Sequence, residues 1–396
     1  MNTRSHYLVG SAGYPNFGDE FIAAAWLRYL ADVDPDTDVW LDSPDPGNAQ
    51  HLFAGLHPRL RVTNTLWRLM GEHSSLPPEE AADRIGALVR NFGSPRYDLG
   101  LMQVREASSL HLIGGGYING IWPQHLGLVA AMKAVRSVTG ARLYATGQGL
   151  LPVAEGLPDP RSLFEGFDYA AARDHQSAEA FGLPARLDDA FLAASDAVAA
   201  AAPGAPRGLM VCIQSDLAAP GRLEEIIATV RPMIRQAVED GREVRYLEAI
   251  PGVDYAAYEQ LADLIPEDNF LPFSHVWRHG LPVGPNQQWI TTRFHLHLLA
   301  AAAGARGIAL SVRPGYYDVK HGSLAAIGSG WTLEDGGPLH MPVRRGPLAG
   351  NLAALTADKR AEADALYSRR STVDTDPEAD SGAPSLWRRA RTVLGR

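Results

Sequence analysis

The sequence is poor in cysteine, in positive charge and in long apolar runs, and each shortage excludes a class of protein. Its single cysteine, Cys212, cannot form an internal disulfide, and its apolar neighbours indicate a buried strand. Lysine and arginine number 36 against 45 acidic residues, and the resulting net charge of -9 argues against nucleic acid as a partner. No apolar run approaches the roughly 20 residues that cross a bilayer, and the N-terminus has no signal-peptide pattern. We therefore expect a cytoplasmic protein.

The rest of the composition is that of a globular protein with two domains. Apolar residues make up 46% of the 396 residues and charged residues 20%, which supplies enough apolar material for ordered cores. A single hydrophobic core rarely serves a chain longer than about 300 residues, so we expect two domains.

Short apolar runs alternate with amphipathic helical patterns, which is typical of parallel α/β sheets. In the first half the predicted strands are 6–12, 37–41, 109–113 and 141–146, and the predicted helices are 19–33 and 126–138. In the second half the predicted strands are 208–214, 243–249 and 307–312, and the predicted helices are 222–239 and 254–265. The pattern predicts an α/β fold with two Rossmann-type domains.

The domain boundaries follow from the connections between these patterns. Residues 197–207 are rich in alanine and contain prolines and a glycine, which is typical of a surface connection. We place an N-terminal domain in residues 1–200 and a C-terminal domain in residues 208–345. Residues 346–370 are expected to hold a late helix, over 352–367, that packs back across the hinge.

Residues 371–396 have a composition of their own. Four acidic residues stand among serine, glycine and proline, which predicts a disordered tail. The arginines that follow leave two interpretations open. The segment is either a solvated tail or a short basic amphipathic helix that makes weak contact with the inner face of a membrane.

The turn after the first predicted strand, residues 13–20, is a candidate binding segment. It reads Gly-Tyr-Pro-Asn-Phe-Gly-Asp-Glu and includes Asn16 and Asp19. Ligands of Rossmann-type folds collect at the carboxyl ends of the strands, where this turn lies. It lacks the G-x-G-x-x-G spacing of a dinucleotide site. Asp19 either contacts a ligand or caps the following helix.

Three glycines, Gly114, Gly115 and Gly116, directly follow the strand predicted at 109–113. Glycine lets the backbone approach a ligand closely, and a helix start behind it would offer N–H donors to an anion. Ordinary turn chemistry explains the same run. His125, at the start of the next predicted helix, either faces the crevice or caps a turn.

Arg173 stands at the end of a further short strand pattern within residues 167–177, and Lys320 follows the strand predicted at 307–312. The fork-shaped guanidinium of Arg173 suits a carboxylate or a phosphate, unless an acid such as Asp174 holds it as a structural pair. Lys320 either offers a point charge to a phosphate or lies at the surface. Both residues are candidates for binding an anion.

Arg293 and His295 stand together at a predicted helix N-terminus, after the apolar residues 289 and 290. A positive charge there opposes the helix dipole unless an anion compensates it, which favours a bound anion. His295 and His297 are two positions apart and do not share a helix face, so we expect no metal site.

In their order and spacing, these segments resemble the polysaccharide pyruvyl transferase family. The resemblance spans about Gly13 to Gly322. It rests on Asn16, Gly18, Asp19 and Glu20; Gly114, Gly115 and Gly116; Gly147, Gln148, Gly149 and Pro152; Arg173, Asp174 and Ser177; Asp188, Asp189, Ala190 and Phe191; Thr292, Arg293, Phe294 and His295; and Lys320. The resemblance implies a GT-B-like arrangement, in which two Rossmann-type domains face a cleft. It also implies a transferase without a cofactor that moves pyruvyl from phosphoenolpyruvate to sugar hydroxyls of a cell-surface glycan, forming a pyruvate ketal.

The resemblance also implies roles for single residues. We expect catalytic roles for His295, Arg293, Arg173 and His125, and substrate-binding roles for Asn16, Asp19, Gly114, Gly115, Gly116, Gln148 and Lys320. The arginines would clamp the donor carboxylate and phosphate, and His295 would act as general acid or base. The expected partners are phosphoenolpyruvate and a glycan or lipid-linked oligosaccharide acceptor. The alternatives are a GT-B glycosyltransferase that uses a nucleotide sugar and a non-catalytic glycan-binding relative.

Overall fold

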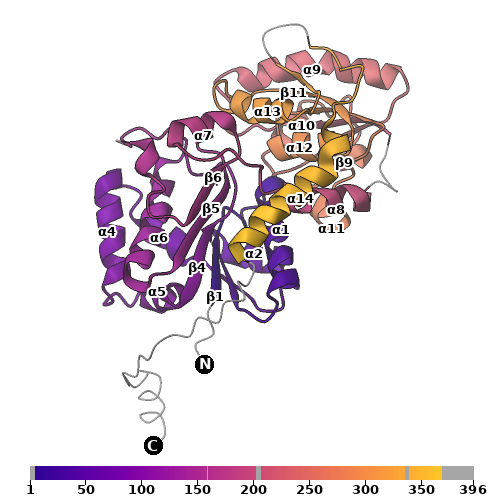
Figure 1. The fold of residues 1–396 in the computed structure, drawn as a ribbon. Helices are drawn as coiled ribbons and strands as arrows, with labels where there is room; N and C mark the ends of the chain where they lie inside the picture. Colours follow the sequence, from indigo (N-terminus) through magenta and orange to yellow (C-terminus); the bar gives the residue numbers. More distant parts are fainter. Residues whose placement is uncertain (1–4, 158, 202–206, 335–338, 368–396) are drawn as a thin grey trace, which may run out of the picture.

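The computed structural model describes residues 5–157, 159–201, 207–334 and 339–367. The chain forms two α/β halves, each built on a six-stranded parallel sheet with helices on both faces (Figure 1). The strand order is β3-β2-β1-β4-β5-β6 in the first sheet and β12-β11-β10-β7-β8-β9 in the second. If β7 is counted as the first strand, the second sheet has the order 6-5-4-1-2-3. This is the order of the first sheet read from its opposite edge. The predicted fold of two Rossmann-type halves is confirmed.

In the described residues, the N-terminal half contains the first six strands and eight α-helices. Its strands are β1 Ser5–Val9, β2 Val39–Asp42, β3 Leu60–Thr63, β4 Ala107–Leu112, β5 Arg142–Gln148 and β6 Tyr169–Ala172. Its helices are α1 Phe17–Val33, α2 Pro46–Leu52, α3 Thr65–Glu72, α4 Pro78–Arg90, α5 Asp98–Arg105, α6 Leu126–Thr139, α7 His175–Phe181 and α8 Phe191–Ala201. Short 3-10 turns cover Pro123–His125 and Pro160–Ser162.

The C-terminal half contains the other six strands. They are β7 Gly208–Cys212, β8 Val244–Leu247, β9 Phe270–Leu271, β10 Gln287–Thr291, β11 Arg306–Ala309 and β12 Thr332–Leu333. Its helices are α9 Arg222–Glu239, α10 Tyr255–Glu259, α11 Phe273–His279, α12 Phe294–Ala302, α13 Tyr317–Ala326 and α14 Leu348–Tyr367, with a 3-10 turn over Glu267–Asn269.

Two expected elements differ from the structure. The helix predicted over 254–265 ends at Glu259, and successive turns bring the buried Leu261 and Ile265 into the core at helix-like spacing. Residues 197–201, expected in a connection, are the last turns of α8, because alanine favours helix wherever packing allows it. The tail predicted over 371–396 lies outside the described residues.

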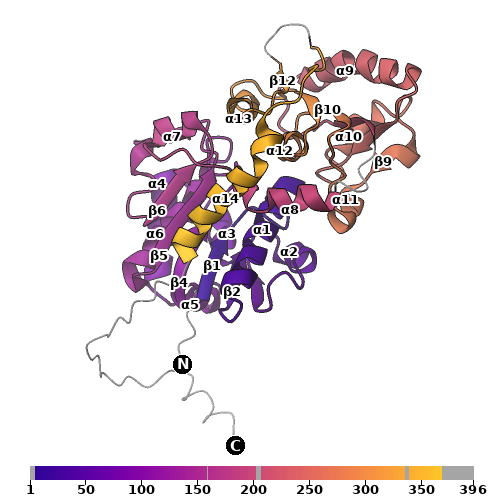
Figure 2. The ribbon, with the colours of Figure 1, turned by 45° about the vertical axis from the view of Figure 1, so that its right-hand side comes forward.

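Helix α14 joins the two halves. It leaves the C-terminal half and runs along the N-terminal half in both views (Figures 1 and 2). The hydroxyl of Tyr29 donates to Asp364 Oδ1 at 2.8 Å, and that of Tyr169 donates to Glu362 Oε1 at 2.6 Å. The helix predicted to pack back across the hinge is therefore present and begins at Leu348. None of the described helices combines the length and the apolar character needed to cross a bilayer.

Aromatic packing also ties the halves together. Trp277 of α11 contacts Phe17 of α1 at 6.5 Å and Phe53 at 6.0 Å between ring centroids. Its indole N–H donates to the carbonyl of Leu52 at 3.4 Å. One hydrophobic cluster accordingly includes buried residues of both halves. This shared core holds the carboxyl ends of the two sheets opposite each other.

Candidate active site

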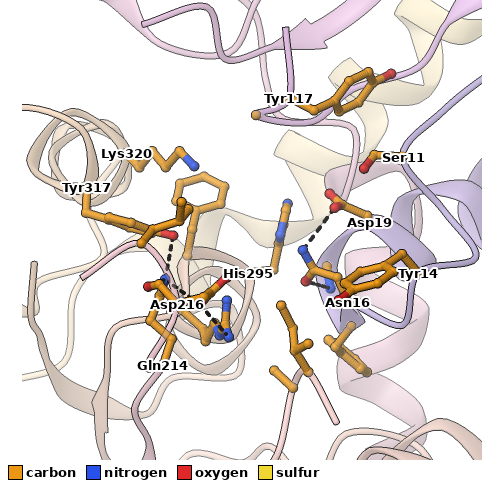
Figure 3. A pocket seen from close by; sticks show the side chains of 18 of the residues that line it. Ser11, Tyr14, Asn16, Asp19, Tyr117, Gln214, Asp216, His295, Tyr317 and Lys320 are labelled. Atoms are coloured by element: carbon orange, nitrogen blue, oxygen red, sulfur yellow. Dashed lines mark hydrogen bonds and ion pairs between the residues drawn. The ribbon is translucent and has the colours of Figure 1, made fainter. Parts of the chain in front are cut away.

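A cavity of about 370 Å³ lies between the two halves. It is lined by segments that follow β1, β4 and β6 on one side and β7, β8, β10 and β11 on the other, as expected at the carboxyl ends of parallel strands. Figure 3 shows Asn16 and Asp19 on one side, Asp216 and Lys320 on the other, and His295 between them. Its volume falls within the range of small-molecule sites, roughly 300–1,000 Å³.

The turn over residues 13–20 is closed by its own polar groups. Asn16 is the N-cap of α1, since its side-chain oxygen accepts from Gly18 N at 3.3 Å, and its amide donates to Asp19 Oδ2 at 2.9 Å. The carboxylate of Glu20 accepts from Gly13 N at 2.8 Å, and burial raises the pKa of Glu20 to about 8. Asp19 is thus not the cap, and its carboxylate lines the cavity.

A glycine is required where α1 meets α12. A Cβ atom built on Gly18 would lie 1.8 Å from His295 Nδ1, so any side chain at this position would displace the imidazole. The first turns of two helices from different halves thereby face the same space. The N-terminal end of a helix carries partial positive charge, which favours an anion between them.

Asp188 links the two halves at the site. Its Oδ2 accepts from Arg173 Nη1 at 2.8 Å, and its Oδ1 lies 3.4 Å from His295 Nε2. The second contact is electrostatic rather than a well-formed hydrogen bond. Burial alone would raise the pKa of Asp188, but His295 and Arg173 outweigh it and hold that pKa well below its ordinary value. Arg173 also lies 4.4 Å over the ring of Phe294.

Arg293 is held by two carboxylates. Its Nε donates to Asp254 Oδ1 at 3.1 Å, and its Nη2 lies 3.1 Å from Asp216 Oδ1. Burial disfavours its charge, yet these two carboxylates raise the pKa of Arg293 above its ordinary value. The expectation that a bound anion compensates the cations at the N-terminus of α12 is corrected, because Asp188, Asp216 and Asp254 already provide negative charge.

Lys320 is a cation of the cavity that forms no ion pair with another described residue, although the carboxylates of Asp19 and Asp216 favour its charge from beyond ion-pair distance. No hydrogen bond or ion pair joins its ammonium group to another described residue, and it lies over the rings of Tyr316 at 3.7 Å and Tyr317 at 4.9 Å. Removal from bulk water lowers its pKa well below the ordinary lysine value, and Arg173 lowers it further. Such a group favours a bound anion, which would restore its charged form.

Gly116 marks the point where two cations approach the chain. A Cβ atom there would lie 2.9 Å from Lys320 Nζ and 3.0 Å from Arg173 Nη2. The two side chains come from different halves. Of the three glycines predicted to contact substrate, Gly116 lines the cavity.

The other two glycines and Gln148 lie behind the cavity wall and do not line the cavity. Gln148 is fully buried, and its amide donates to the carbonyls of Leu112, Ile113 and Thr146 at 2.9–3.1 Å. Gly114 N donates to Asp189 at 2.7 Å, and Gly115 N donates to the carbonyl of Gly147. The expected helix start behind Gly116 is also absent, because the next helical turn begins at Pro123.

His125 lines the cavity from the N-terminal half. Its Nδ1 lies 2.9 Å from the carbonyl of Tyr117, and its ring meets that of Trp67 edge-on at 4.9 Å and stacks against Trp122 at 6.0 Å. Burial lowers the pKa of His125. Both open interpretations therefore apply, since His125 contacts the crevice and closes a turn.

His297 points away from the site. It is fully buried, its Nδ1 lies 3.1 Å from His321 Nδ1, and its ring stacks on Trp331. Among the described residues, no group of three or more histidine, cysteine, aspartate or glutamate side chains is arranged to hold a metal ion.

Sequence reasoning missed several residues of the site. Asp188 belonged to a recognised motif, so a signal for it existed. Asp216 and Asp254 stand in segments without a motif, and only the fold brings them to Arg293. Tyr316 and Tyr317, whose rings lie beneath the ammonium of Lys320, were not assigned a role from the sequence either.

Comparisons with known proteins agree with this arrangement. A family model described as polysaccharide pyruvyl transferase matches residues 16–314. The crystal structure of a UDP-N-acetylglucosamine 2-epimerase is similar with a TM-score of 0.51 and 11% identity, over 96% of this chain and 100% of that one. The Neisseria meningitidis UDP-GlcNAc 2-epimerase, bound to UDP-GlcNAc, gives a TM-score of 0.50 and 8% identity, over 91% and 100%. These likenesses show the fold, two parallel-sheet domains of GT-B type. No curated protein matches significantly.

Proposed function

We propose that this chain, which belongs to the polysaccharide pyruvyl transferase family, transfers pyruvyl from phosphoenolpyruvate to two hydroxyls of a glycan sugar. The product is a pyruvate ketal on a cell-surface glycan or its lipid-linked precursor. One observation carries the proposal. The ammonium of Lys320 faces a cavity between the halves without an ion-pair partner among the described residues, beside Arg173 and close to the N-termini of α1 and α12.

The charges of the donor match the cations of this cavity. Phosphoenolpyruvate carries a carboxylate and a phosphate on the same carbon atom, so it needs two cationic or N–H-rich contacts a short distance apart. Lys320 and Arg173, which both approach Gly116, supply one contact. The facing helix N-termini and Arg293 supply the other. Asp188 and Asp254 orient the two guanidinium groups rather than removing them from the cavity.

The reaction consists of a proton transfer, two additions and one departure. Protonation of the donor methylene carbon makes it a methyl group and leaves an oxocarbenium-like centre at the adjacent carbon. One sugar hydroxyl adds there, phosphate leaves with its oxygen, and a second hydroxyl adds to close the ketal. Of the two hydroxyl protons, one replaces the proton given to the methylene carbon and the other leaves with the phosphate. No electron is transferred, so we propose no cofactor.

His295 is the proton-transferring group in this scheme. Its ring lies between Asp188 and Gly18 at the junction of the halves. Histidine is the side chain that most readily gains and loses a proton near neutral pH. A histidine beside a carboxylate is held in one orientation, which favours directed proton transfer. Lys320 stabilises the negative charge of the leaving phosphate.

Ligand binding separates this function from a glycosyltransferase that uses a nucleotide sugar. Thermal unfolding is measured with phosphoenolpyruvate and, separately, with UDP-glucose, because a ligand that binds the native state raises the unfolding temperature. We expect phosphoenolpyruvate to stabilise the wild type and not the Lys320→Met variant. Lys133→Met, which changes a partly buried lysine of α6 away from the cavity, is the matched control and should keep the response. Stabilisation by UDP-glucose alone would contradict the proposal.

A further inference from the structure

Behind the cavity, helix α14 inserts one lysine into the N-terminal half. The side chain of Lys359 is fully buried, and its Nζ lies 2.5 Å from Asp189 Oδ1 and 2.7 Å from Glu362 Oε2. It also donates to the carbonyl of Leu187 at 3.0 Å. The ammonium group thus forms one hydrogen bond, to the carbonyl, and two ion pairs, with the carboxylates. Two of them, Leu187 and Asp189, flank Asp188 in the sequence.

Asp189 connects several elements of the N-terminal half through hydrogen bonds. Its Oδ2 accepts from Trp26 Nε1, from Gly114 N and from Thr146 Oγ1, each at 2.7 Å. These donors come from α1 and from the segments at the ends of β4 and β5. The other oxygen is left to Lys359, so the carboxylate joins α14 to the elements that surround the site.

We propose that Lys359 is a positioning residue that holds Asp188 against Arg173 and His295. The inference rests on the proposed function, because it assigns a role at the same site. Lys359 fixes the chain on both sides of Asp188, through the carbonyl of Leu187 and the carboxylate of Asp189. Loss of either contact frees the chain beside Asp188, whose side chain bridges the two halves.

The buried pair of Lys359 and Asp189 is better suited to orienting the chain around Asp188 than to stabilising the fold. Burying two charges removes them from water, and replacing a buried pair with apolar residues of similar volume is often neutral or stabilising. A methionine in place of Lys359 would fill the same space. It could not hold an acidic side chain and a carbonyl at fixed positions, as an ammonium with three donors does.

The test uses the full chain with ¹⁵N-labelled histidine and follows the ring nitrogens of His295 by NMR. The signal is assigned by its absence from the His295→Asn variant. Lys359→Met is compared with Asp364→Asn, a control on the same helix that removes the charge beside Tyr29 but does not contact Asp189. The double variant Asp189→Asn/Lys359→Met removes both charges and covers the case in which Lys359→Met alone does not fold.

We expect the ring signals of His295 to move in both Lys359 variants and to stay in place in Asp364→Asn. Phosphate release from phosphoenolpyruvate with acceptor present should fall at least ~10-fold in the Lys359 variants and less than ~2-fold in the control. Unchanged His295 signals in the folded Lys359 variants would overturn the proposal. If the signals move but the wild type releases no phosphate, the positioning role stands and the proposed reaction fails.

Discussion

His295, on the first turn of a helix in the C-terminal half, places its Nε2 3.4 Å from the Oδ1 of Asp188 in the N-terminal half. The contact joins the histidine of one half to the carboxylate that also binds Arg173. The catalytic geometry therefore depends on how the two halves are held together. The aromatic contacts of Trp277 and the crossing of α14 fix that relation.

Replacing His295 by asparagine should slow the reaction much more than it weakens donor binding. General acid and base groups contribute about 10²- to 10⁴-fold to rates, whereas the donor anions are bound mainly by Lys320 and Arg173. We expect phosphate release to fall by roughly that factor while the Kd for phosphoenolpyruvate changes less than ~10-fold. Steady-state kinetics and calorimetry measure the two quantities. An equal loss in both would make His295 a binding residue.

Replacing Lys320 by methionine should weaken donor binding and stabilise the free protein. A charged hydrogen bond contributes about 1.5–3 kcal/mol, or roughly 10- to 100-fold in Kd.

The folded-state pKa of Lys320 lies below that of the unfolded chain, so between the two values the unfolded state binds more protons and stability rises with pH. Lys320→Met should lack this rise. Denaturant unfolding at several pH values, without ligand, tests it, and identical profiles for the two proteins would contradict the environment assigned to Lys320.

Replacing Asp188 by asparagine should destabilise the fold and remove part of its acid sensitivity. Breaking one partner of a buried ion pair costs about 3–5 kcal/mol, and Arg173 would be left without its carboxylate. The pKa of Asp188 is depressed in the folded state, so its stabilisation is present above about pH 4 and is lost as the pH falls further. Chemical unfolding from pH 7 downward should show a shallower acid slope for the variant than for the wild type. An unchanged slope would contradict the pairing.

Glu20 predicts the opposite dependence on pH. Burial raises its folded pKa to about 8, so its stabilising contribution is complete below its unfolded pKa, about 4.3, and is lost as the pH rises through 8. Glu20→Gln retains an oxygen that can accept from Gly13 N but does not ionise. The variant should therefore lose less stability than the wild type between pH 5 and pH 8.5. A parallel fall in both proteins would show that Glu20 ionises normally.

Much of the fold was predictable because its signals are local. Helix α9 begins and ends at the predicted residues, and α6 differs from its prediction by one residue, since each has an amphipathic pattern. The helices α3, α4 and α5 were not predicted, because the segment that holds them has no motif. The prediction of a helix over 254–265 was wrong beyond Glu259, because the turns that follow repeat the apolar spacing of a helix.

The residues of the site could be predicted where strand order sets their position. They could not be predicted where side-chain packing sets their contacts. Arg173, Arg293, His295 and Lys320 follow strand ends, and the ends of parallel strands meet at one edge of each sheet. The direction of the Gln148 side chain depends on three carbonyls that the sequence does not identify. The partners of Arg293 and Lys359 are distant in sequence and meet only in the folded chain.

Mass spectrometry of the reaction product tests the central claim most directly. The purified chain is incubated with phosphoenolpyruvate and glycans or lipid-linked oligosaccharides taken from cells of its source in which the coding sequence has been deleted. We predict that the acceptor gains the mass of a pyruvate ketal, that phosphate appears in equal amount, and that the His295→Asn protein produces neither. An acceptor that stays unmodified by the wild type, or that gains a sugar from UDP-glucose instead, would contradict the account.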